Sequence, residues 1–157
     1  MPRAKRIYVD ESGINTRLQR EYARAPRGEI TRDVRRGGKF GRVNVIGALC
    51  EGAYIGVECY RHPTDGNFFE SRFKECFLNK FPKGYTVIMD NARFHRKKEL
   101  GKMARGKVRL LFLPPYSPDY NPIEKSRANM KRFLGNYLHT YQSVESAVYD
   151  YFGVVKN

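Results

Sequence analysis

Three acidic residues stand at positions from which their carboxylates could share one site. Asp10 and Asp90 each follow a short apolar run, Ile7–Val9 and Thr86–Met89, rich in the β-branched residues that favour a buried strand. Ser12 and Gly13 supply a turn after the first run, and Glu124 opens a predicted helix. Carboxylates at strand ends gather at the rim of a sheet, where α/β folds bind ligands. We therefore predict that the three carboxylates converge.

Converging carboxylates in a basic protein need a cation to balance their charge. Mg²⁺ and Mn²⁺ take oxygen ligands and leave coordination positions open for phosphate oxygens. Two such ions would hold the attacking and leaving oxygens of a phosphoryl displacement. We predict Asp10, Asp90 and Glu124 as metal ligands and catalytic residues, with Mg²⁺ or Mn²⁺, as two ions, as the cofactor.

Each of these residues also has a purely structural interpretation. Asp90 could cap the helix that follows it, and residues 121–124 match a helix start in which Asn121 is the N-cap and Glu124 completes a capping box. Two further acids are interpreted as lying outside the site. Glu11 follows the first aspartate out of register, and Asp119 belongs to a proline-rich turn.

The overall charge points to a polyanionic partner. The 157 residues, enough for one domain, carry 30 Lys and Arg against 16 Asp and Glu, a net charge of +14. Such an excess makes nucleic acid the first partner to consider. No apolar run has membrane-spanning length, and the three cysteines lack zinc spacing, so we predict an intracellular protein without a membrane partner.

Much of the basic charge lies in an inserted loop at about residues 14–42, which lacks hydrophobic periodicity and is broken by Gly and Pro. A one-sided charge run is either a solvated surface or a phosphate-contacting loop, and here both interpretations stand. His95, after the second aspartate, could contact phosphate or tune the site. The residues predicted to bind DNA are Arg17, Arg20, Arg32, Arg35, Arg36, Arg42, His95, Arg96 and Lys97.

The elements around these residues predict an α/β fold. Val43–Cys50 and Tyr54–Tyr60 form a hairpin next to the first strand, and Thr86–Met89 and Val108–Leu113 are two strands each followed by a helix. We expect a five-stranded mixed sheet, with three antiparallel and then two parallel strands, flanked by helices. One helix begins with a capping box at Asn67, and the residues that follow at the spacing of one buried helical face are Phe69, Phe73, Cys76 and Phe77. The helix from Ile123 has an apolar stripe of Ile123, Met130, Leu134, Tyr137 and Leu138.

Three motifs resemble one protein family. They are Asp10-Glu-Ser-Gly13, Val87-Ile-Met-Asp-Asn-Ala-Arg-Phe-His95 and the stretch Leu111–Lys125, which contains Pro-Pro-Tyr-Ser-Pro-Asp-Tyr-Asn-Pro-Ile-Glu. Together they resemble the catalytic domain of the bacterial IS630-type transposases, in the Tc1/mariner group of the DDE superfamily. The resemblance runs from about Ile7 to Phe133.

This resemblance implies an RNase H-like fold and a metal-binding triad of Asp10, Asp90 and Glu124. It also implies cleavage at transposon ends and strand transfer into target DNA at a TA dinucleotide, in the bacterial cytoplasm at the nucleoid. Family members carry N-terminal helix-turn-helix modules, whereas only nine residues precede Asp10 here. We therefore expect these modules to be absent, and a homodimer or a partner chain to be involved.

Two other functions are compatible with the pattern. The chain could be a non-catalytic nucleic-acid-binding fragment of a split or truncated transposase, which the missing modules favour and the intact triad does not. A different RNase H-like nuclease would fit the fold and the charge. It would not account for the Pro-Pro-Tyr-Ser-Pro stretch.

Overall fold

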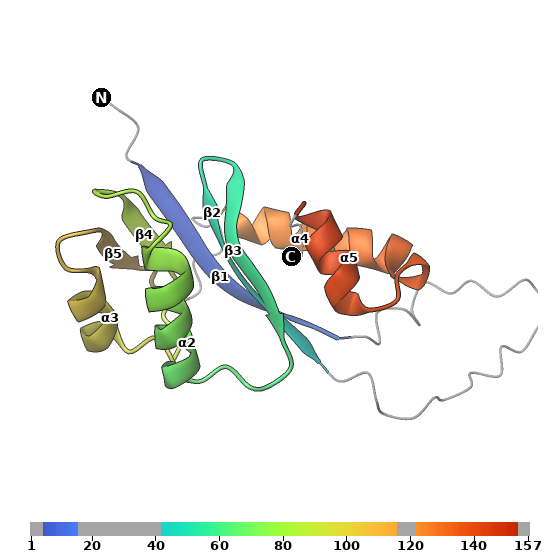
Figure 1. The fold of residues 1–157 in the computed structure, drawn as a ribbon, viewed down its shortest axis with the longest axis horizontal. Helices are drawn as coiled ribbons and strands as arrows, with labels where there is room; N and C mark the ends of the chain where they lie inside the picture. The colour runs from blue at the N-terminus through green and yellow to red at the C-terminus, as the bar shows by residue number, and fades with distance from the viewer. Residues whose placement is uncertain (1–4, 16–41, 116–121, 154–157) are drawn as a thin grey trace, which may run out of the picture.

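One five-stranded sheet forms the centre of the fold, with strand order β3-β2-β1-β4-β5 (Figure 1). The computed structural model describes residues 5–15, 42–115 and 122–153. The strands are β1 (Arg6–Ile14), β2 (Val43–Cys50), β3 (Ala53–Tyr60), β4 (Thr86–Met89) and β5 (Arg109–Phe112). The pairs β1–β2 and β2–β3 are antiparallel, and β1–β4 and β4–β5 are parallel. The predicted mixed sheet is confirmed.

β1 is longer than the sequence indicated. The turn predicted at Ser12 and Gly13 is wrong, because β1 continues to Ile14, which pairs with Val43 of β2. The parallel pairing with β4 ends earlier, at Tyr8. Asp10 therefore lies within a strand that extends past the end of its parallel neighbour. Pairing with β2 supplies backbone hydrogen bonds that a local turn signal cannot outweigh.

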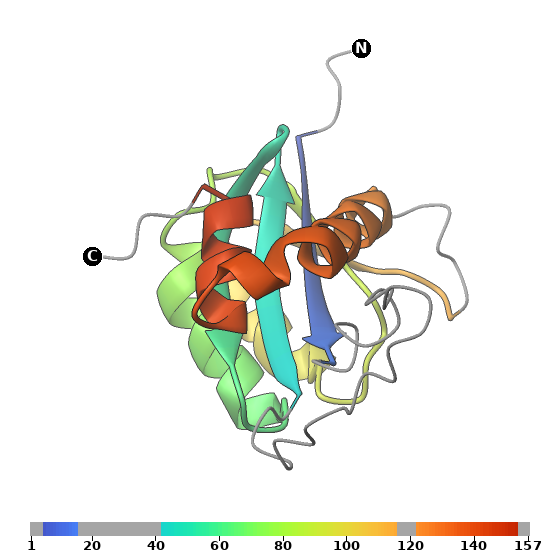
Figure 2. The same cartoon turned by 90° about the vertical axis from the view of Figure 1, so that its right-hand side faces the viewer.

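Helices cover both faces of the sheet (Figures 1 and 2). One face is covered by α2 (Gly66–Arg72), the π-helix η1 (Phe73–Leu78) and α3 (Lys97–Ala104); the other is covered by α4 (Ile123–Tyr137), the 3₁₀ turn η3 (Leu138–Thr140) and α5 (Val144–Tyr151). Each face has its own hydrophobic core. Among the described residues, no helix is long and apolar enough to cross a membrane.

The helix after β3 agrees with its predicted buried face but begins at a different residue. Phe69, Phe73 and Phe77 are fully buried against the sheet, as their spacing indicated. The capping box predicted at Asn67 is wrong: the N-cap is Asp65, whose carboxylate accepts a hydrogen bond from the backbone N–H of Phe68. Asp and Asn are both strong N-cap residues, so local sequence could not choose between them.

Candidate active site

Asp10 and Asp90 occupy matching positions on the two central parallel strands. The pairing of β1 with β4 ends at Tyr8 and Ile88. Each aspartate comes two residues after that last pair, so the same register places Asp10 opposite Asp90. Side chains at matching positions of paired strands point to the same face of a sheet. The fold thus brings together two carboxylates that are far apart in the sequence.

Asp10 is buried at this position, on the face that α4 covers. Nη2 of Arg127 donates a hydrogen bond to Oδ2 of Asp10 and a second one to the backbone carbonyl of Glu11, at 2.8 Å. Burial raises the pKa of Asp10 to about 7, against the lowering effect of Arg127. The negative charges of Glu11, Glu124 and Asp90 add to the rise.

Glu124 joins this group through the same arginine. It lies in the first turn of α4, and Nη1 of Arg127 is 3.2 Å from its Oε2 atom. Residues three apart on a helix share a face, so Glu124 lies beside Arg127, which reaches β1. A single guanidinium therefore connects Asp10 with Glu124. Pro122 stands at the N-cap of α4 without a side-chain capping bond, and Asn121 lies outside the described residues.

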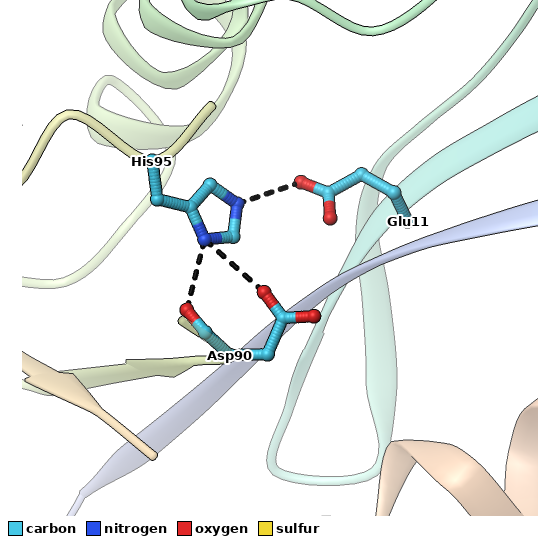
Figure 3. A group of neighbouring side chains, drawn as sticks. All are labelled: Glu11, Asp90 and His95. Carbon is cyan, nitrogen blue, oxygen red and sulfur yellow. Dashed lines mark hydrogen bonds and ion pairs between the residues drawn. The ribbon is translucent and has the colours of Figure 1, made fainter. Parts of the chain in front are cut away.

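The side chain of Asp90 contacts His95 instead of Arg127 (Figure 3). Nδ1 of His95 lies 2.9 Å from the backbone carbonyl oxygen of Asp90 and 3.2 Å from its Oδ1 atom, and Nε2 lies 3.1 Å from Oε1 of Glu11. The alternative interpretation of Asp90 as a helix cap is wrong. The next helix, α3, begins at Lys97 with Arg96 as its N-cap.

The surroundings of His95 favour its protonated form. Its side chain is fully buried and both ring nitrogens face oxygen acceptors, so both must carry a hydrogen to bond there. Burial alone lowers the pKa of His95, but hydrogen bonds to Asp90 and Glu11 outweigh it and raise that pKa to about 10. The hydrogen bond from His95 in turn lowers the pKa of Asp90. Of the two roles considered for His95, this burial favours tuning the site.

Glu11 belongs to the site although sequence reasoning excluded it. As strand alternation requires, it points to the face opposite Asp10, but His95 reaches it there (Figure 3). Burial raises the pKa of Glu11, and its hydrogen bond with His95 opposes that rise. The signal that could have identified Glu11 is the adjacency of two acids in a strand, which places one carboxylate on each face.

Of the three predicted metal ligands, Asp90 alone belongs to the close group of potential ligand atoms found among the described residues, and Asp10 and Glu124 lie outside that group. Among the residues that the structure describes, Glu11, Asp90 and His95 place ligand atoms within 4.8 Å of one another. Mg²⁺ and Mn²⁺ prefer oxygen ligands, so the carboxylates of Asp10, Asp90 and Glu124 suit them better than a protonated imidazole. Arg127 already places a positive charge between two of these carboxylates. The three predicted carboxylates therefore suit a hard divalent cation in their chemistry, and two of them are paired with Arg127 in this structure.

A cleft adjoins Asp10 beneath α4 and α5. It is lined by Asp10, Ser12, Val45, Gly47, Tyr54, Val57, Ile123, Ser126, Arg127, Met130 and Phe152. Three buried polar atoms of these residues, Ser12 Oγ, Tyr54 OH and Arg127 Nε, have no hydrogen-bond partner within the described ranges. Buried polar atoms are normally paired, so these three atoms could form hydrogen bonds with a group that enters the cleft.

The predicted DNA contacts divide into described and undescribed residues. Arg42, Arg96 and Lys97 are exposed, whereas Arg17, Arg20, Arg32, Arg35 and Arg36 lie outside the described residues. Nε of Arg96 is 2.6 Å from Oε1 of Glu70, and Nζ of Lys97 lies 5.1 Å from the centre of the Phe112 ring. Arg96 and Lys97 follow His95 directly in the chain, and their charged groups contact Glu70 and Phe112 in this structure.

Comparisons with known proteins identify the family of the chain and its fold. The family described as DDE superfamily endonuclease matches residues 5–146. A search of curated protein sequences finds no significant match. Among solved structures, the Mos1 transposase paired-end complex with left transposon end superposes with a TM-score of 0.60 at 14% identity, over 95% of this chain and 51% of that one.

Retroviral integrases share the fold as well. The catalytic core domain of BIV integrase has a TM-score of 0.56 at 12% identity, covering 95% of this chain and 81% of the integrase chain. The HTLV-2 integrase catalytic core domain in complex with magnesium has a TM-score of 0.53 at 11% identity, covering 94% and 82%. At these identities the likeness shows the fold, which is the RNase H-like core of transposases and integrases. The chain spans about half the length of the Mos1 transposase chain.

Proposed function

Because the chain belongs to the DDE superfamily endonuclease family, we propose that it is the catalytic domain of a DNA transposase. It would cleave phosphodiester bonds at the ends of a transposable element and join the freed 3′-hydroxyl to target DNA. The observation that carries this proposal is the matching position of Asp10 and Asp90 on paired parallel strands, with Glu124 connected to Asp10 through Arg127.

Asp10, Asp90 and Glu124 would hold Mg²⁺ or Mn²⁺, as two ions. Bound there, the metal would stabilise the charge that develops on the attacking and leaving oxygens of a phosphoryl displacement. The three carboxylates differ in solvent exposure. The Asp10 side chain is only 8% exposed, while those of Asp90 and Glu124 are 55% and 41% exposed. Asp10 therefore forms the floor of the site, and the other two face the approaching DNA.

The remaining residues of the site position these ligands. His95 holds Asp90 by its backbone and side-chain oxygens and keeps its carboxylate ionised, as a metal ligand must be. Arg96 and Lys97, which follow His95 in the chain, would attract the phosphate backbone by their positive charge. The basic loop at about residues 14–42 would extend this DNA-binding surface.

The finer assignment rests on the sequence resemblance. By that resemblance, the chain would be part of an IS630-type transposase of the Tc1/mariner group that targets a TA dinucleotide. A second copy or a partner chain would supply the helix-turn-helix modules. The likeness to a Mos1 paired-end complex supports action on transposon ends by an assembly of chains. This chain matches about half of the Mos1 transposase, so recognition of specific ends is proposed for the assembly.

Nicking of supercoiled plasmid DNA by the purified protein tests the chemistry without knowledge of the end sequence. Wild-type protein should nick in Mg²⁺ or Mn²⁺ and not in a chelator. Asp90→Asn should abolish nicking, because an amide cannot replace the charge of the carboxylate, and should leave the protein folded. Wild-type protein that binds DNA but never nicks it would support the alternative of a non-catalytic nucleic-acid-binding fragment.

A further inference from the structure

Arg127 holds the place between carboxylates in which a divalent cation would be bound. Its Nη2 atom contacts Oδ2 of Asp10, and its Nη1 atom lies 3.2 Å from Oε2 of Glu124. Two of the three carboxylates in the proposed triad are therefore neutralised by a residue of the chain itself. A metal ion and a guanidinium compete for the same carboxylate oxygens.

We propose that Arg127 is an internal counterion of the metal site, which the divalent cation must displace before Asp10 and Glu124 can bind it. The proposal rests on the proposed function, because it takes the metal site as given. Arg127 would then control the affinity of the site for the metal. The residue is a positioning residue that holds Asp10 and Glu124 together until the metal replaces it.

The geometry of Arg127 supports displacement. Its side chain is 25% exposed, so it has access to solvent, and on leaving it would give up its hydrogen bond to the Glu11 carbonyl as well as its two carboxylate partners. Its Nε atom is buried without a hydrogen-bond partner in the part of the chain that the structure describes, so the arginine is not fully satisfied where it is. The adjoining cleft also contains the unpartnered oxygens of Ser12 and Tyr54, which can accept hydrogen bonds from a displaced guanidinium.

Loss of the arginine has a direct cost in the absence of metal. Asp10 is buried with Arg127 as its counterion, and removing one partner of a buried pair leaves an uncompensated charge. A bound metal would supply the missing charge. The stability lost on replacing Arg127 should therefore return when the metal is added.

Titration calorimetry of Mn²⁺ into the DNA-free protein tests the competition. Arg127→Gln should bind Mn²⁺ about tenfold more tightly than wild type, because an intramolecular competitor lowers the apparent affinity by the fraction of sites it leaves open. The matched control is Lys125→Gln, which removes an equal charge from an exposed residue next to Glu124. Lys125→Gln should leave the Mn²⁺ affinity within about twofold of wild type, since exposed charges act weakly through water.

Thermal melting gives a second measurement that does not depend on activity. Without metal, Arg127→Gln should melt below wild type, and saturating Mn²⁺ should remove most of the difference. If Arg127→Gln does not fold, Arg127→Lys takes its place. Lysine keeps the charge without the fork that reaches two carboxylates, and should tighten Mn²⁺ binding to a smaller extent.

The outcomes separate this inference from the proposed function. If Asp90→Asn abolishes Mn²⁺ binding while Arg127→Gln binds no better than wild type, the metal site stands and the role of Arg127 is refuted. Equal tightening by Arg127→Gln and Lys125→Gln would also refute it, because the effect would then be one of general charge. If neither wild type nor Arg127→Gln binds Mn²⁺, the metal site fails together with this inference.

Discussion

The carboxylate of Glu11 lies 3.1 Å from Nε2 of His95, a residue 84 positions later in the chain. The other ring nitrogen of His95 faces Asp90. One buried imidazolium thus holds the carboxylates of Glu11 and Asp90, while the guanidinium of Arg127 holds those of Asp10 and Glu124. Each internal cation connects β1 to a segment distant in the sequence.

This arrangement predicts that the free energy of unfolding decreases as the pH rises from about 6.5 to 10. His95 has a pKa of about 10 in the folded protein and about 6.5 when unfolded. Between these values the folded state binds the extra proton, so the contribution of His95 is complete below about pH 6.5 and is lost as pH rises through 10. Denaturant unfolding of the metal-free protein at intervals from about pH 6 to 10.5 measures this decline.

The matched variant for this measurement is His95→Gln, which cannot titrate. Lys and Tyr residues also titrate near pH 10, so the informative quantity is the difference in unfolding free energy between wild type and the variant. That difference should shrink steadily above about pH 6.5. Parallel curves over the whole range would show that His95 carries no proton linked to folding.

Glu124→Gln distinguishes a metal ligand from a helix-start residue. A partly exposed ion pair such as that of Glu124 with Arg127 is worth about 0.2–1 kcal/mol, so stability should change little. Plasmid nicking should fall by orders of magnitude, because glutamine lacks the charge that a metal ligand supplies.

Glu99→Gln on α3 is the control for Glu124→Gln. Glu99 also pairs with a cation three residues later, Lys102, at 3.4 Å, but lies outside the candidate site. It should lose equally little stability and keep full nicking activity. Undiminished nicking by Glu124→Gln would remove Glu124 from the proposed metal ligands.

Gly56 should tolerate no side chain. Its φ is +64°, and a Cβ atom there would lie 2.8 Å from a ring carbon of Phe77. Gly56→Ala combines left-handed strain with a core clash, and should cost about 2–4 kcal/mol. Gly52→Ala separates the two effects, because Gly52 has a φ of +83° with nothing within 4 Å of its added Cβ. Urea unfolding should therefore show the larger loss for Gly56→Ala, and equal losses would exclude the clash.

The basic loop should bind DNA through charge rather than through base contacts. Arg32, Arg35 and Arg36 lie outside the described residues, and the prediction rests on the sequence. Replacing all three with Ala should weaken binding at low salt and reduce the salt slope by about 0.9 for each phosphate that the variant no longer neutralises. Affinities for two unrelated duplexes over a range of salt concentrations measure this slope.

Lys74, Lys80 and Lys83 provide the control for the loop variant. They are exposed on or just after η1 and carry the same total charge. Their replacement with Ala should leave the slope nearly unchanged. An unchanged slope for the loop variant on both duplexes would count against DNA binding by the loop.

The sequence alone determined the elements that depend on neighbouring residues. The β-branched run Thr86–Met89 became β4, and the aromatic spacing of Phe69, Phe73 and Phe77 became a buried helical face, because side-chain periodicity decides which face can be buried. Local sequence did not decide every boundary or every buried position. Asp65 was chosen over Asn67 as an N-cap, and Tyr137, predicted in the apolar stripe of α4, is 52% exposed.

Only the tertiary structure decided how the carboxylates are held. Arg127 reaches Asp10 across 117 positions and His95 reaches Glu11 across 84, and no local pattern specifies either contact. Both follow from the register of β1 with β4 and from the face that α4 covers. Sheet register and helix docking minimise the free energy of the whole chain, whereas sequence patterns reflect only neighbours a few residues apart. The sequence could therefore nominate Asp10, Asp90 and Glu124, and the fold placed Arg127 between Asp10 and Glu124 and His95 between Asp90 and Glu11.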